Sequence, residues 1–170
     1  MFFKGLKEKS ILKAISKHNN SRQLLDGNSK FKTIGFLINS DEVSITDKEL
    51  VAVCKVFNAN NLGVLYYTKI RKKTNIELGL ISPKNIGWSA VLKLPKLKKF
   101  CQTEFDVLIT LTQTDSIYLN AINAFSKARF KVSTTCSDDY LNDLIVRTTP
   151  FEVNVFTSEL KKYLTILNKL

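Results

Sequence analysis

Two nearly continuous apolar runs restrict the folds open to this chain of 170 residues. They are TIGFLIN (33–39) and NLGVLYYT (61–68), and such runs are typical of strands buried on both faces of a sheet. Between them lies a segment with apolar residues at helical spacing, which Thr46 or Asp47 can cap. A strand, a helix and a strand in this order form a right-handed crossover between parallel strands. The sequence therefore predicts a parallel sheet covered by helices.

The remainder of the chain continues this alternation. Apolar runs and helical spacing predict strands at 105–112, 130–134 and 141–148, and helices at 115–128 and 157–170. Ser158 is a candidate cap for the last helix. Alternating strands and helices indicate an α/β fold. We therefore expect a Rossmann-like or flavodoxin-like three-layer sandwich with a mostly parallel sheet.

The middle of the chain is less regular. Residues 75–82 are typical of a short strand, which would place the cations of 69–73 at the tip of a hairpin. PKNIGWSAVLKLP (83–95) contains two prolines and a glycine, so we expect an excursion over the surface, anchored by Trp88. KLKKFCQ (96–102) is expected to be a short helix.

The N-terminal segment is expected to be helical over residues 4–25, with Ile11, Leu12 and Ile15 on one face and lysines opposite. Other apolar residues fall on a different side, so the helix lacks the single apolar stripe of a membrane-surface helix. We expect it to dock on the domain or on a protein partner. The chain is accordingly divided into two parts, a basic helical arm at 1–30 and a single α/β domain at 31–170.

The formal net charge of +11 is concentrated in two blocks. Residues 1–32 hold eight Lys and Arg against two acidic residues, and residues 69–99 hold nine against Glu77. Segregation of this kind favours a polyanionic partner, and a surface that only keeps the protein soluble is the alternative. The candidate phosphate contacts are Lys9, Lys13, Lys17, Lys69, Arg71, Lys72, Lys73, Lys93, Lys96, Lys98 and Lys99.

Three widely spaced cysteines, Cys54, Cys101 and Cys136, form no CxxC motif, so we expect free thiols in a reducing compartment. The lysines of MFFKGLKEKS interrupt any export signal, and no segment approaches the ~20 apolar residues of a membrane span. These features predict a cytoplasmic protein without a transmembrane segment.

Catalytic motifs are missing from the sequence. It contains no GxxxxGK[ST] phosphate loop and no GxGxxG after the first strand, and His18, its one histidine, has no metal-binding partner nearby. We therefore expect no metal, no cofactor and no enzymatic activity.

Polar residues follow the expected strands, where open α/β sheets bind their ligands. This makes a pocket for a nucleotide or nucleotide-sugar the alternative function. The candidate lining residues are Asn39, Ser40, Asp41, Thr112 and Asp115.

Several segments, nearly end to end, resemble a family of uncharacterised proteins of similar length from Bacteroidetes (Flavobacteria and relatives). They are GLKEKSILKAI, TIGFLIN followed by SDE, PKNIGW, FDVLITL, AFSKARFKV and ELKKYLTILNKL. The resemblance implies a cytoplasmic bacterial protein and brings no activity with it.

A shorter segment, FDVLITLTQTDSIYLNAINAFSKARFKVS (105–133), is similar to part of the N-terminal domain of heptosyltransferase-like glycosyltransferases. That resemblance implies a Rossmann-like half. Those enzymes need a second, nucleotide-sugar domain, for which this chain has no room.

Three functions follow from these patterns. The first is a non-catalytic protein that binds structured RNA, on the ribosome or another translation-related particle, through a Lys- and Arg-rich face. The second is a small-ligand module or degenerate transferase half, and the third is a protein-interaction adaptor that uses the N-terminal helix.

Overall fold

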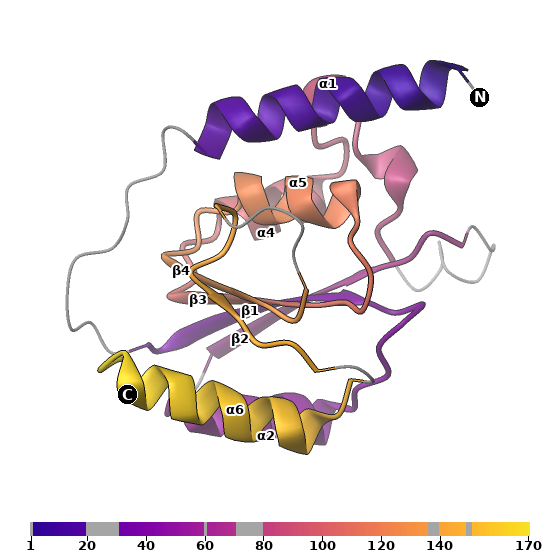
Figure 1. The fold of residues 1–170 in the computed structure, drawn as a ribbon. Coiled ribbons are helices and arrows are strands. Elements are labelled where there is room, and N and C mark those ends of the chain that lie inside the picture. The colour runs from indigo at the N-terminus through magenta and orange to yellow at the C-terminus, as the bar shows by residue number, and fades with distance from the viewer. Residues whose placement is uncertain (1, 20–30, 60, 71–79, 136–139, 149–150) are drawn as a thin grey trace.

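The structure, a computed structural model, describes residues 2–19, 31–59, 61–70, 80–135, 140–148 and 151–170 (Figure 1). Its sheet has the order β2-β1-β3-β4-β5, and every pair of neighbouring strands is parallel. This is the flavodoxin-like order of doubly wound folds, so the predicted α/β class is confirmed. The strands are β1 Thr33–Asn39, β2 Asn61–Tyr67, β3 Val107–Leu111, β4 Phe130–Ser133 and β5 Leu144–Ile145.

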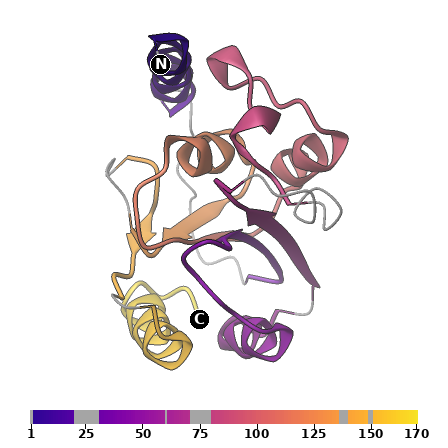
Figure 2. The same ribbon diagram turned by 90° about the vertical axis from the view of Figure 1, so that its right-hand side faces the viewer.

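Helices cover both faces of the sheet and complete the predicted three layers. Helices α2 and α6 lie on one face and α4 and α5 on the other, while α1 lies outside α5 (Figures 1 and 2). The helices are α1 Phe2–Asn19, α2 Asp47–Val56, α4 Pro95–Gln102, α5 Ile117–Phe125 and α6 Val153–Ile166, with the 3-10 turns η1 Pro83–Asn85 and η2 Trp88–Ala90.

Local sequence explains the start of α2 but not that of α6. Thr46 caps α2 in a reciprocal pair with Glu49: Glu49 Oε2 accepts from Thr46 N (2.7 Å), and Thr46 Oγ1 accepts from Glu49 N (3.3 Å). The prediction that Ser158 caps the last helix is wrong, because α6 begins a turn earlier, at Val153. Phe156 is fully buried with Leu160, so the apolar face of α6 extends upstream of Ser158.

Helix α1 packs against α5 and the segment that contains η1 and η2. Ile11 and Ile15 are buried in that interface. Leu12 was expected beside them but is 56% exposed, because α1 presents only a narrow face to one helix and one loop. Polar contacts hold the helix in register: Lys7 Nζ donates to the Pro83 carbonyl (2.8 Å) and Ser89 N donates to Ser10 Oγ (3.0 Å).

The segment after β2 differs from the predicted hairpin. Ile81 forms a parallel bridge with Tyr67, whereas a hairpin requires antiparallel pairing. The hairpin interpretation is therefore wrong at Ile81, and residues 71–79 lie outside the described part of the chain. Trp88 does not anchor the 83–95 excursion, because its side chain is half exposed while Ile86 and Ala90 are buried in its place.

The amino ends of β1 and β3 are joined by one carboxylate. Asp106 Oδ2 accepts from Lys32 N (2.9 Å), Thr33 N (3.0 Å) and Thr33 Oγ1 (2.9 Å). Partial burial opposes ionisation of Asp106, but these bonds and one from Arg129 outweigh it, so the pKa of Asp106 lies below its ordinary value. An ionised side chain thus fixes the register at this end of the central strand pair.

Two glycines on neighbouring strands make room for an aromatic ring. Gly35 of β1 and Gly63 of β2 are partners in the parallel register, and the ring of Phe105 lies over both. A Cβ at either glycine would come within 2.7 Å of a Phe105 ring carbon, which is closer than real Cβ atoms approach. The glycines are therefore required by close packing.

We predict that Gly35→Ala lowers the free energy of unfolding by roughly 1–3 kcal/mol, because the added methyl overpacks the Phe105 ring. Urea denaturation measures the change. Gly5→Ala is the matched control: Gly5 lies in α1 with nothing within 4 Å of the added Cβ, and should gain up to about 1 kcal/mol from helix propensity. Equal effects of the two substitutions would contradict the packing argument.

Candidate functional site

The carboxyl ends of β1 and β3 form the topological switch point of this sheet. The chain leaves β1 toward α2 on one face and leaves β3 toward α5 on the other (Figure 2). Doubly wound proteins bind their ligands outside such a point. Four of the five residues of the alternative pocket, Asn39, Ser40, Asp41 and Thr112, lie at this edge.

The structure connects these four residues to neighbouring strands. Asn39 is buried and its Nδ2 donates to Thr112 Oγ1 (3.3 Å). Ser40 Oγ donates to the Tyr67 carbonyl (2.9 Å), and Asp41 Oδ1 accepts from Thr68 Oγ1 (2.6 Å). Their polar atoms thus join the ends of the strands.

Asp115, the fifth candidate, is turned toward its own helix. Its Oδ1 accepts from Asn120 Nδ2 of α5 (2.8 Å) at the exposed surface. The contacts that bring the other four candidates together therefore do not include Asp115.

Glu42 occupies the switch point and is not among the site residues predicted from the sequence. Its Oε2 accepts from Gln113 N (2.8 Å), Thr114 N (3.0 Å) and Thr112 Oγ1 (2.7 Å), and its Oε1 accepts from Thr114 Oγ1. Lys69 Nζ lies 3.9 Å from Oε1. The donors that could hold an anionic ligand at this edge are thus already bound to a carboxylate of the chain itself.

The electrostatics of the edge match this structural role. Partial burial opposes ionisation of Glu42, but the bonds from Thr114, Thr112 and Gln113 together outweigh it, and the pKa of Glu42 lies below its ordinary value. Tyr67 is the last residue of β2 and is buried at the same edge of the sheet. Burial raises the pKa of Tyr67 to about 12. Glu42 is therefore ionised and Tyr67 neutral at physiological pH, so neither is poised for proton transfer there.

We predict that Glu42→Gln lowers the free energy of unfolding by roughly 1–3 kcal/mol at neutral pH, because an amide cannot replace all the bonds that the carboxylate accepts. Urea denaturation at several pH values tests this. Since the pKa of Glu42 is lower in the folded chain, its contribution is complete above the unfolded pKa near 4.5 and is lost as the pH falls through the folded value.

The difference between wild type and Glu42→Gln should therefore shrink below about pH 4.5. Glu104→Gln, at an exposed glutamate before β3, is the matched control and should change stability by less than about 0.5 kcal/mol at any pH. A pH-independent loss in Glu42→Gln would contradict the proposed role of the ionised carboxylate.

Most of the candidate phosphate contacts lie on the face of the sheet that α5 covers. Helix α1 and residues 80–102, which include α4, lie on the same face of the sheet as α5. We call these two segments together the lysine-rich layer. Helix α1 has five lysines against Glu8, and residues 80–102 have five lysines and no acidic residue. The seven candidates in this layer are all exposed: Lys9, Lys13, Lys17, Lys93, Lys96, Lys98 and Lys99.

The helices on the other face are nearly neutral. Helix α2 carries two lysines and two acidic residues, and α6 carries Lys161 and Lys162 against Glu159. The charge contrast between the two faces therefore follows the layers of the fold. It could not be read from the sequence without knowing which helices share a face.

The cationic run at 69–73 stands apart from this layer as far as it is described. Lys69 follows β2 and lies near Glu42 at the switch point. Arg71, Lys72 and Lys73 fall outside the described residues. Their membership of a common basic surface stays a prediction.

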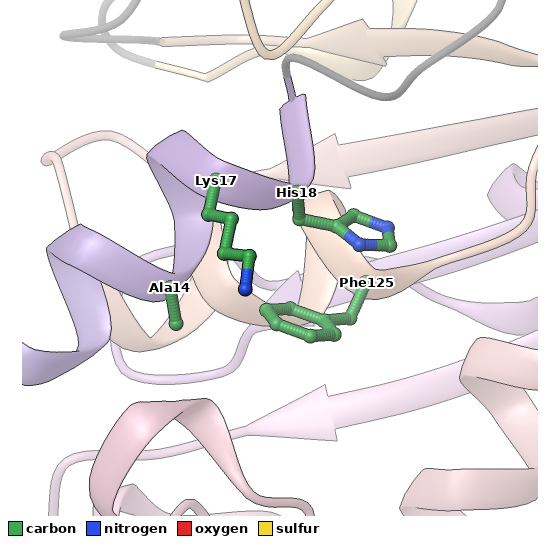
Figure 3. Close-up of a pocket in the computed structure, with 4 residues that line it drawn as sticks. All are labelled: Ala14, Lys17, His18 and Phe125. Carbon is green, nitrogen blue, oxygen red and sulfur yellow. The ribbon is translucent and has the colours of Figure 1, made fainter.

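His18 lies in a shallow depression of about 320 Å³ where the ends of α1 and α5 meet (Figure 3). Its ring stacks on Phe125 with 4.6 Å between centroids and 11° between planes. Burial, and then the positive charge of Lys131, lower the pKa of His18. His18 is therefore a neutral packing residue at physiological pH. The depression is lined by Ala14, Lys17, His18 and Phe125.

A second depression, of about 180 Å³, runs along the outer edge of β2 beside α4. Lys96 and Lys99 line it together with the rings of Phe100 and Phe105. Two cations thus border an apolar surface there, on the side of the lysine-rich layer. Within the described residues, no cluster of three or more His, Cys, Asp or Glu could hold a metal ion.

The fold and this edge define a doubly wound α/β protein whose switch point is filled by its own side chain. The chain belongs to a family of unknown function, DUF6913, whose profile matches residues 7–167. No curated protein and no solved structure is significantly similar to it. Among the described residues, no helix is long and apolar enough to cross a membrane.

Proposed function

We propose that this protein binds structured RNA of a ribonucleoprotein particle, such as the ribosome, through the lysine-rich layer. The observation that carries the proposal is the segregation of charge between the two faces of the sheet. Helix α1 and residues 80–102 together hold ten lysines against Glu8, while α2 and α6 are close to neutral. A cationic face of this kind is the electrostatic footprint of a polyanion-binding protein.

The geometry of α1 suits contacts with phosphates. Lys9, Lys13 and Lys17 recur at helical spacing on the side opposite Ile11 and Ile15, and all three are exposed. Lys17 also borders the depression beside Phe125. Their flexible side chains can each neutralise a phosphate and release a counterion, a source of affinity that carries no sequence readout. The layer therefore supports binding to the RNA backbone.

An anionic membrane surface fits the same charge less well. A helix that lies in a bilayer interface needs an apolar face turned toward the lipid. Ile11 and Ile15 of α1 are covered by α5, and the exposed apolar residues of α1 are spread around the helix among lysines and form no single face: Phe3, Leu6 and Leu12. A small anionic ligand at the switch point is also less favoured, because Glu42 occupies the donors there.

Members of the bacterial family that the sequence resembles are expected to be cytoplasmic. RNA particles are abundant in that compartment. We therefore place the proposed activity in the bacterial cytoplasm.

We predict that the triple substitution Lys9→Glu, Lys13→Glu and Lys17→Glu weakens binding to a structured RNA by roughly tenfold or more. The slope of log Kd against log salt concentration should fall by about two to three, since each lost phosphate contact removes about one unit. Fluorescence anisotropy of labelled ribosomal RNA fragments, measured at several salt concentrations, gives both quantities. All three lysines are exposed, so the fold should be unaffected.

The matched control is Lys48→Glu, Lys55→Glu and Lys161→Glu. It makes the same change in net charge on the exposed surface of α2 and α6. Its effect on the salt slope should be below about one unit, because only long-range potential changes. Equal losses in the two triple variants would mean that net charge alone drives binding, and would contradict a specific face.

A further inference from the structure

The loop that carries η2 is built in an unusual way. Ser89 and Ala90 are consecutive non-glycine residues with left-handed backbones, at φ 50° and φ 59°. This conformation is unfavourable for residues that have a Cβ, and such outliers gather at functional sites. The surrounding structure must therefore hold the loop in place.

Backbone hydrogen bonds close the loop on itself. Gly87 N donates to the Val91 carbonyl (2.7 Å), and Val91 N donates to the Trp88 carbonyl (3.1 Å). Below them, Ile86 and Leu92 form an antiparallel bridge. The loop is thus a small closed hairpin with Trp88 at its tip.

The rest of the molecule fixes the hairpin and leaves the indole outside. Ile86 and Ala90 are buried in the core beneath α1, and Ser89 N is bound to Ser10 Oγ of α1. Trp88, by contrast, is 51% exposed. The large ring of Trp88 thus lies at the surface, while the small side chain of Ala90 is buried.

Two lysines lie close in sequence to Trp88. Lys84 and Lys93 are exposed on the two arms of the hairpin, and the Lys93 side chain passes beside Gly87. Lys7 is held on the Pro83 carbonyl, where burial and then the charge of Lys93 lower its pKa and Glu8 partly opposes this.

We propose that Trp88 is a stacking platform for an unpaired nucleobase in a loop or bulge of the bound RNA, with Lys84 and Lys93 on the flanking phosphates. The inference rests on the proposed function and specifies its ligand. Unpaired bases stack on aromatic side chains, whereas the bases of an A-form duplex are inaccessible to them. A half-exposed indole on a closed hairpin, with exposed lysines on both arms, matches the first kind of contact.

The chain contains one tryptophan, so emission excited at wavelengths that tyrosine does not absorb reports on Trp88 alone. We expect a short oligouridine, or a hairpin with a uridine loop, to quench this emission saturably. A fully paired duplex of equal length should bind through lysines and leave the emission unchanged. Trp88→Ala should weaken binding of the loop RNA by about tenfold or more and leave duplex binding unchanged.

Trp88→Phe should retain part of the affinity for loop RNA, since a smaller ring still stacks. Tyr140→Ala, at an aromatic residue that is 84% exposed after β4, is the matched control and should bind loop RNA like wild type. Unchanged thermal midpoints would show that the variants remain folded.

The failures of the two proposals are distinguishable. RNA binding with unchanged emission, or with equal affinity in Trp88→Ala, overturns the stacking platform and leaves the lysine-rich layer as an RNA-binding face. No binding to any RNA overturns both proposals. A blue shift of the emission on vesicles of phosphatidylglycerol, without a response to RNA, would identify a bilayer-contacting loop instead and would also overturn both.

Discussion

The pairing of β1 with β3 is the contact on which the rest of the structure depends. A carboxylate closes this pair at each end: Asp106 binds the backbone where β1 begins, and Glu42 binds the loop where β3 ends. Each carboxylate is stabilised in its ionised form by the donors that it joins. The crossovers that follow β1 and β3 leave this pair toward opposite faces, so the pair positions α2 on one face of the sheet and α5 on the other.

Glu42 also fills the position where doubly wound proteins usually bind a ligand. In doubly wound folds the switch point offers free backbone donors to a ligand, and here those donors bind the side chain of the chain itself. The helical layer built on α5 carries the excess positive charge and the half-exposed Trp88. Binding by a charged outer surface, with the sheet as its rigid support, is the function that this division of roles favours.

Most of the fold was predictable because strands buried on both faces and capped helices leave local signatures, as the β1 run and Thr46 show. The predictions that failed concern residues whose positions depend on tertiary contacts. Trp88 was expected to anchor residues 83–95, but the closed hairpin buries Ala90 instead. Four of the five candidate pocket residues lie at the switch point, but Glu42 was not predicted there because its donors lie about seventy residues away in sequence. Seven of the candidate lysines lie in one layer, which could not be predicted because it depends on how the helices pack.

The most direct test of the account is a lysine-reactivity footprint of the whole protein, free and bound to ribosomal particles, read by mass spectrometry after mild acylation. We expect protection of the exposed lysines of α1 and of residues 80–102, with unchanged reactivity at Lys48, Lys55 and Lys161 on the other face. Protection should disappear at high salt, because it comes from phosphate contacts. Equal protection of both faces, or protection confined to α2 and α6, would contradict the claim that the lysine-rich layer binds RNA.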